Sequence, residues 1–184
     1  PFERALDRLE PLIAAARADG LAVETLDLGG GFGIGYRAEA PGLRALVAPL
    51  LPRVQALGCR VVVEPGRYIA GPAGALVTEI TYVKRRGDRR FVITDAGMTE
   101  LIRPALYEAW HEVRPVAAPL EGARTFRADI VGPICETADF LALDREVPAL
   151  ARGDLLAVMD AGAYGASMGS NYNARPKPPE VLVD

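Results

Sequence analysis

Apolar residues recur every three or four positions from Phe2 to Ala16, and charged residues fill the positions between them. This spacing predicts an amphipathic helix, for which Asp19-Gly20 supplies a stop signal. Residues 22–28 form a short apolar strand that runs into residues 29–33, where four of five positions are glycine. The chain therefore opens with a helix and then a strand that leads into a flexible backbone loop.

The same order of helix and strand repeats further along. Apolar positions in residues 43–54 fit a second helix, which Pro49 and Pro52 should kink or shorten because each removes a backbone donor. Residues 60–64 form a second short apolar strand, followed by the loop Pro65-Gly66-Arg67. Alternation of helix and strand is typical of parallel β/α architecture.

From about Gly71 the pattern changes to strict alternation of side-chain character. Residues 76–83 alternate, a turn follows at Arg85-Arg86-Gly87-Asp88, and residues 91–94 form the next strand. Further strands are expected at residues 126–131, 140–143, 155–159 and 181–183. We therefore predict an α/β region over residues 1–71, and a mostly antiparallel β domain, sandwich or barrel-like, over residues 72–184.

The composition restricts the partners of this chain. Half of its 184 residues are hydrophobic (50%), and 21 basic residues against 24 acidic ones give a net charge of only -3. We therefore expect no binding to nucleic acid or to an anionic membrane, and small molecules or proteins as partners. No apolar run approaches the roughly 18 residues of a membrane helix, and no signal segment opens the chain, which predicts a soluble protein.

With two cysteines and one histidine, the chain has few side chains that could bind a metal ion or form a disulfide. Cys59 and Cys135 lie far apart and outside any C-x-x-C pattern, so with His111 they cannot form a zinc site of the usual type. We predict no metal, and a reduced cytoplasmic setting rather than a disulfide. Nucleophilic Cys-His catalysis is disfavoured because His111 has no recognisable orienting partner.

Two loops of the first region are candidate binding sites. One offers unhindered backbone N–H groups, and the other carries charged side chains. The glycines of residues 29–33 could form a nest for phosphate oxygens or simply a structural turn. Ile34 stands where the G-x-G-x-x-G dinucleotide motif requires its third glycine, so we reject a nicotinamide site. Glu64 ends the second strand and Arg67 follows, and two parallel strands would present both loops on one face. A surface ion pair between Glu64 and Arg67 is the alternative.

The second region has candidates of its own. Arg103 and Tyr107 would share one side of a helical turn and could clasp a carboxylate, or they are an exposed arginine and a half-buried tyrosine of an ordinary helix. Cys135 could donate a proton or be a small buried side chain. Tyr164 could be an aromatic ring packed at a strand end.

Six segments resemble, in order, motifs of the barrel-type (fold type III) pyridoxal-phosphate (PLP) dependent amino-acid decarboxylases. They are L-D-L-G-G-G-F-G (26–33), E-P-G-R (64–67), D-A-G-M with L-I-R-P-A-L-Y (95–107), G-P-I-C-E-T-A-D (132–139), D-A-G-A-Y-G-A (160–166) and S-N-Y-N-A-R-P (170–176). Ala138 stands where glycine is frequent in the family. The resemblance implies that residues 1–71 are the last strands of a (β/α)8 barrel, and that residues 72–184 are the β domain without its final segment.

The resemblance also implies roles for these residues. Gly30 and Gly31 would bind the PLP phosphate, and Glu64 would face the pyridine nitrogen and keep it protonated, so that the ring can accept electrons. Cys135 would be the catalytic residue that donates the proton replacing the lost carboxylate. The implied cofactor contacts are Gly30, Gly31, Glu64, Pro65, Gly66, Arg67 and Tyr164.

Within the family, the L-I-R-P-A-L-Y, C-E-T and S-N-Y-N elements resemble those of diaminopimelate decarboxylases. This implies conversion of meso-diaminopimelate to L-lysine and CO2, the last step of lysine biosynthesis. The implied substrate contacts are Arg67, Arg103, Tyr107, Glu136 and Tyr164. A homodimer is also implied, in which the partner subunit supplies the segment containing Cys135 and Glu136 to each active site.

The lysine that would hold PLP is the main open point. The chain contains only Lys84 and Lys177, and neither matches the cofactor lysine of the family. Because the chain begins at Pro1 with a helix already running by Phe2, we expect sequence upstream and no decarboxylation by this polypeptide alone. The alternatives are a related decarboxylase acting on arginine, ornithine or a carboxylated polyamine, and a non-catalytic relative that regulates a decarboxylase subunit.

Overall fold

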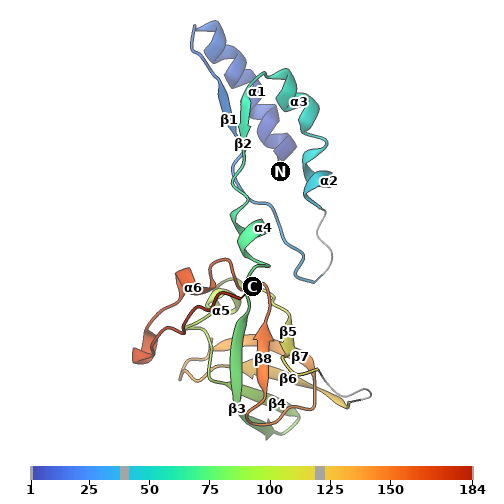
Figure 1. The fold of residues 1–184 in the computed structure, drawn as a ribbon, viewed down its shortest axis with the longest axis vertical. Helices are drawn as coiled ribbons and strands as arrows, with labels where there is room; N and C mark the ends of the chain where they lie inside the picture. Colours follow the sequence, from blue (N-terminus) through green and yellow to red (C-terminus); the bar gives the residue numbers. More distant parts are fainter. Residues whose placement is uncertain (1, 38–41, 119–122, 184) are drawn as a thin grey trace. The chain divides into compact units, whose positions relative to one another are not determined.

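The computed structural model describes residues 2–37, 42–118 and 123–183. The chain forms two compact units, Pro1–Tyr68 and Ile69–Asp184 (Figure 1). The first unit contains α1 (Phe2–Ala18), β1 (Thr25–Asp27), α2 (Leu43–Val47), α3 (Leu51–Ala56) and β2 (Arg60–Val62), and α4 (Gly66–Ala70) crosses the boundary between the units.

Helix α1 packs against the core of the first unit through its apolar side, and its C-terminal end is well defined. Leu6 and Ile13 are buried and belong to the core of the first unit. The helix stops where Gly20 takes a φ of +83° and the N–H of Leu21 donates to the carbonyl of Ala16 across 3.0 Å. Glycine adopts this left-handed conformation without strain, so the predicted helix and its stop signal are confirmed.

The second predicted helix is divided in two, as its prolines suggested. Helix α2 ends at Val47, and Pro52 lies in the first turn of α3, where its missing N–H costs nothing. Leu50 and Val54 are buried and complete the core together with Leu26 of β1. The break at Pro49 therefore still leaves an apolar side facing the core.

Strands β1 and β2 pair in parallel, with Leu26 opposite Val61. The ladder continues past the strand ends, because Leu28 donates to the carbonyl of Val62 across 3.0 Å. In a parallel pair the carboxyl ends meet at one edge. The glycine loop and the Glu64 loop therefore start side by side, as the sequence predicted.

The second unit is built on one six-stranded sheet in the order β5-β8-β3-β4-β6-β7 (Figure 1). Its strands are β3 (Leu76–Arg86), β4 (Arg89–Thr94), β5 (Val113–Pro115), β6 (Thr125–Val131), β7 (Phe140–Pro148) and β8 (Leu155–Val158). All pairings are antiparallel except that of β4 with β6. The end strands β5 and β7 also touch, so the sheet is nearly closed and resembles a barrel.

Alternation along the strands fills the interior of this sheet. In β3, Thr78 and Ile80 are buried whereas Val77 and Glu79 are exposed, as a strand with one face in the core requires. The core of the unit is mainly aliphatic and consists of Ile80, Val92, Leu101, Ala128, Ile130, Leu141, Ala142, Val147, Leu156, Val158 and Ala161. The predicted mostly antiparallel β domain is confirmed. Three short helices flank the sheet: α5 (Arg103–Tyr107), α6 (Gly165–Met168) and the 3-10 turn η1 (Tyr172–Ala174).

One strand prediction was wrong, and one strand was missed. Residues 181–183 are exposed and form no strand, because no neighbouring strand pairs with them in the part of the chain that the structure describes. Strand β5 was not predicted; it lies at the sheet edge, where Pro115, which lacks an N–H, is tolerated. Among the described residues, no helix has the length and apolar character needed to cross a membrane.

Candidate functional site

The predicted site residues fall into two groups, one in each unit. In the first unit, the N–H of Glu64 donates to the carbonyl of Gly29 across 2.9 Å. A Cβ at Gly30 would lie 2.6 Å from the carbonyl oxygen of Glu64, so only glycine fits this close approach. Gly29 and Gly31 have φ values of +70° and +88°, with open space beside both. The two predicted loops therefore meet, and the glycine backbone is uncovered on its other side.

Glu64 and Arg67 occupy different positions after β2. Glu64 is exposed at the edge, whereas Arg67 is half-buried within α4, which begins at Gly66. Among the ion pairs of the described residues, none joins Glu64 to Arg67. The surface ion pair considered from the sequence is therefore absent, and both side chains can serve a ligand.

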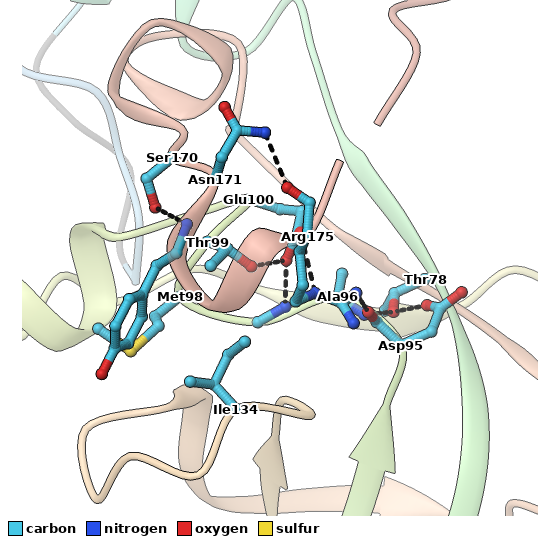
Figure 2. Close-up of polar contacts among 12 residues, drawn as sticks. Thr78, Asp95, Ala96, Met98, Thr99, Glu100, Ile134, Ser170, Asn171 and Arg175 are labelled. Atoms are coloured by element: carbon cyan, nitrogen blue, oxygen red, sulfur yellow. Dashed lines mark hydrogen bonds and ion pairs between the residues drawn. The ribbon is translucent and has the colours of Figure 1, made fainter. Parts of the chain in front are cut away.

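In the second unit, the segment after β4 is fastened to β3 by polar contacts (Figure 2). The carboxylate of Asp95 accepts a hydrogen bond from the Thr78 hydroxyl across 2.6 Å and one from the N–H of Glu79 across 2.9 Å. The Thr78 oxygen accepts the N–H of Ala96 across 3.0 Å. These bonds fix the start of the D-A-G-M segment before the chain reaches α5.

Arg175 ties the C-terminal segment to the same place (Figure 2). Its guanidinium donates to the carbonyl of Asp95, and its Nε lies 3.7 Å from the Glu100 carboxylate, at the distance of an ion pair rather than a hydrogen bond. Glu100 is itself buried and accepts the N–H of Gly97 across 2.7 Å. Asn171 donates to the carbonyl of Arg175 across 2.7 Å. The predicted S-N-Y-N-A-R-P segment is thus anchored by its arginine.

The loop that carries Cys135 is held in place by hydrogen bonds to the side chain of Asp139. The buried carboxylate of Asp139 accepts the N–H of Met98 across 2.7 Å and that of Ile134 across 2.6 Å. A Cβ on Gly97 or on Gly132 would overlap this carboxylate, so only glycine at these two positions leaves room for it. Burial raises the pKa of Asp139, and the two backbone N–H groups oppose this change.

Cys135 and Glu136 lie at the exposed outer part of this loop. The side-chain amide of Asn173 donates to the Cys135 sulfur across 3.5 Å. Asn173 takes a left-handed φ of +56°, a conformation that asparagine tolerates better than most residues. The thiol therefore projects from a fixed loop beside the anchored C-terminal segment, rather than being a small buried side chain.

Arg103 is the first residue of α5, and it is buried although it carries a charge. Its guanidinium carbon lies 5.8 Å from the centre of the Tyr164 ring, and its Nη1 lies 3.4 Å from Nε2 of His111. Tyr107 is in the last turn of the same helix and is exposed, so the predicted helical turn is confirmed. Arg103 and Tyr164 are thus brought together, the arginine buried and the tyrosine half exposed, so the predicted alternative of an exposed arginine beside a half-buried Tyr107 is wrong.

Tyr164 has an unusual backbone. Its φ of +67° is left-handed, which is rare for a bulky residue, and its side chain is half exposed. Residues held in such conformations cluster at ligand sites, where the surrounding structure maintains them. This observation favours a ligand contact over an aromatic ring that only packs at a strand end.

Several organising residues were not identified from the sequence. Asp139, Asn173 and Arg175 lie within the quoted motifs, so a signal existed, but no role was assigned to them. His111 was considered only as a partner for a nucleophilic cysteine. A cavity of about 530 Å³ in the second unit is lined mainly by glycines and alanines, and none of the predicted site residues lines it.

Comparison with known proteins agrees with these motifs. Over its whole length the chain is 46% identical to the diaminopimelate decarboxylase of Aquifex aeolicus and 49% identical to that of Pseudomonas aeruginosa, and it covers 44% of each. It matches the crystal structure of diaminopimelate decarboxylase from Helicobacter pylori complexed with L-lysine, with a TM-score of 0.88 and 36% identity, over 96% of this chain and 44% of that one.

The chain thus spans less than half the length of these relatives. Residues 25–162 match the family described as "Pyridoxal-dependent decarboxylase, C-terminal sheet domain". The resemblance inferred from the motifs is confirmed. The chain belongs to the pyridoxal-dependent decarboxylase family.

Proposed function

We propose that this chain acts in a diaminopimelate decarboxylase, which removes CO2 from meso-diaminopimelate and releases L-lysine. The observation that carries the proposal is the identity of 46–49% with diaminopimelate decarboxylases along the whole chain. The polar groups of the second unit support it, because a buried arginine beside an exposed tyrosine ring suits a substrate with a fixed negative charge.

The loops of the first unit fit pyridoxal phosphate. The uncovered backbone at Gly30 and Gly31 would hold the phosphate, and the adjoining Glu64, Pro65, Gly66 and Arg67 would line the cofactor. Glu64 would hold the proton on the pyridine nitrogen through its carboxylate. When bound, this cofactor supplies an electron sink for the carbon that loses CO2.

The substrate has a carboxylate at each end, and only one of them leaves. Arg103, Tyr107, Tyr164 and Glu136 would hold the amino-acid group that stays, with Arg67 near the cofactor. An arginine paired with the departing carboxylate would stabilise a charge that is lost in the transition state, and this would slow the reaction. We therefore assign Arg103 to the carboxylate that remains on L-lysine.

Cys135 would donate the proton that replaces the lost carboxylate. Its thiol is exposed on a loop fixed by Asp139 and faces the amide of Asn173. General-acid catalysis requires this combination of access and fixed position. Glu136, the next residue, would contact the substrate from the same loop.

The assembly is part of the same proposal. Residues 1–71 would be the last strands of a (β/α)8 barrel, and residues 72–184 would be the β domain that follows it. Two copies would form a homodimer in which each supplies Cys135 and Glu136 to the other's active site. The enzyme would work in the cytoplasm, where cysteines stay reduced.

The test is a product assay on the decarboxylase that contains this chain, loaded with pyridoxal phosphate. We expect L-lysine and CO2 from meso-diaminopimelate, and at most slow CO2 release from ornithine, arginine or a carboxylated polyamine. Faster turnover of any of these three than of diaminopimelate would reject the proposed substrate. Sedimentation of the same preparation should show a dimer.

A further inference from the structure

His111 is a buried polar residue to which the proposed function gives no role. It is the single histidine of the chain, its side chain is fully buried, and it lies between α5 and β5. Buried polar side chains are normally hydrogen-bonded, so the atoms around the ring indicate what it does. Both ring nitrogens of His111 face a polar atom.

The partners determine which nitrogen carries the proton. Nδ1 lies 2.9 Å from the carbonyl oxygen of Met159, which can only accept, so Nδ1 must be the donor. Nε2 lies 3.4 Å from Nη1 of Arg103, which can only donate, so Nε2 must present its lone pair. The geometry therefore selects a neutral ring with its hydrogen on Nδ1.

The surroundings also favour the neutral ring. Burial lowers the pKa of His111, and the positive charges of Arg103 and Arg145 act in the same direction. The Met159 carbonyl and the Asp160 carboxylate oppose them without reversing the direction. A second proton would place an N–H against the N–H of Arg103, so the contact exists only for the neutral form.

His111 thereby links two segments that carry proposed substrate contacts. Met159 follows β8 and precedes the segment that contains Tyr164, and its N–H donates to the carbonyl of Glu112 across 2.8 Å. Arg103 lies on the other side of the imidazole, with its guanidinium near the Tyr164 ring. An imidazole between these segments sets the position of the guanidinium relative to the tyrosine.

We propose that neutral His111 is a positioning residue, which orients the Arg103 guanidinium for the carboxylate that stays on the product. The inference rests on the proposed function, because it takes a diaminopimelate-type substrate as given. Positioning a charged donor in advance avoids the ordering cost at the moment of binding.

Two substitutions test the two ring nitrogens of His111 one at a time. His111→Asn keeps a donor near the Nδ1 position and removes the acceptor that faces Arg103. His111→Gln keeps an acceptor near the Nε2 position. The probes are L-lysine, which carries the retained carboxylate, and cadaverine, which is L-lysine without it. Val147→Ala, a cavity in the same core, is the control for general destabilisation.

Binding is measured by calorimetry on the cofactor-loaded decarboxylase that contains this chain. We expect His111→Asn to weaken L-lysine binding about tenfold, the scale of one hydrogen bond to a charged group, and to change cadaverine binding by less than about twofold. His111→Gln should recover most of the L-lysine affinity, and Val147→Ala should leave the ratio of the two affinities unchanged. In turnover, His111→Asn should raise KM more than it lowers kcat.

Wild-type affinity for L-lysine in His111→Asn would overturn the inference, as would equal weakening of L-lysine and cadaverine. Failure of wild-type protein to bind L-lysine would instead reject the proposed function. If a variant misfolds, a measurement on the wild-type protein still tests the inference. Nitrogen chemical shifts of 15N-histidine protein should show a neutral ring with the hydrogen on Nδ1 at pH 7, and a hydrogen on Nε2 would contradict the proposal.

Discussion

The side-chain amide of Asn173 donates a hydrogen bond to the sulfur of Cys135 across 3.5 Å. The two residues are far apart in the sequence, and each belongs to a separately anchored segment. Asp139 holds the loop of Cys135, whereas Arg175 holds the segment of Asn173. The position of the thiol therefore depends on two attachments, and both are made to the D-A-G-M segment after β4.

Replacing Asn173 should affect the proton-transfer step more than substrate binding. Asn173→Ala removes one donor to the sulfur, so we expect kcat to fall roughly three- to tenfold, the scale of one hydrogen bond, with KM little changed. Asn173→Asp has the same shape and places an acceptor there, so its kcat should fall further. Steady-state kinetics on the cofactor-loaded decarboxylase provide both values. Equal kcat for the two variants would argue against the contact.

Replacing Cys135 itself should have a larger effect. A positioned general acid contributes about 10²–10⁴-fold to rate, so Cys135→Ser should lower kcat by a factor in this range and leave KM near its original value. Cys59→Ser is the matched control, because Cys59 is half-buried in the first unit, where its thiol faces backbone carbonyls. Comparable losses of kcat in both variants would remove the special role of Cys135.

Asp139 should be important for stability. Asp139→Asn turns one of its two acceptor oxygens into a donor that faces a backbone N–H, so we expect a loss of about 1–3 kcal/mol in the free energy of unfolding. Asp144→Asn is the control: Asp144 is exposed and pairs with Arg127, so its substitution should cost much less. Urea denaturation followed by circular dichroism gives both values. A smaller loss at Asp139 than at Asp144 would contradict the anchoring role.

Gly30 offers a test of the cofactor loop. The Cβ of Gly30→Ala would press on the Glu64 carbonyl at 2.6 Å, which would move either the glycine loop or the Glu64 segment. We expect the affinity for pyridoxal phosphate to fall at least about tenfold, because bound phosphate depends on closely placed backbone N–H groups. Gly42→Ala, in open space at a φ of -55°, should leave it unchanged. Absorbance titration with the cofactor measures both.

The buried histidine predicts a dependence of stability on pH. The folded-state pKa of His111 lies below its ordinary value of 6.5, so the unfolded chain binds more protons in the interval between the two values. Its contribution is therefore complete above about pH 6.5 and is lost as the pH falls through the lower folded pKa. The gap in urea midpoint between wild type and His111→Asn should narrow from pH 7.5 to pH 5.5. Fluorescence of Trp110, the single tryptophan, reports the transition.

Much of this architecture was predictable from periodicity and turn residues. The helix over Phe2–Ala18, the parallel pair β1 and β2 and most strands of the sheet follow from local patterns. Strand β5 did not, because its existence depends on pairing with β8 rather than on its own three residues. Residues 181–183 have strand composition and no pairing partner among the described residues, so local pattern was misleading there.

For the candidate site, too, some residues could be predicted from the sequence and others could not. The motifs made Glu64, Arg103, Cys135 and Tyr164 candidates, because short segments with recognisable residue types resemble those of the family. The support around them was not predictable, since Asp139 meets Met98 and His111 meets Met159 only after distant segments fold together. Hydrogen bonds of this kind depend on tertiary position and leave no periodic trace in a single sequence.

The parallel pairing of β4 with β6 has a consequence for the order of folding. Strands joined by a hairpin can zip from their turn, but β4 and β6 are separated by residues 95–124, and closing that span costs entropy before any ladder bond forms. The same span carries Arg103 and His111. The proposed substrate contact of Arg103 should therefore form only as the sheet closes, and a chain halted before closure would have strands but no ordered Arg103 beside His111.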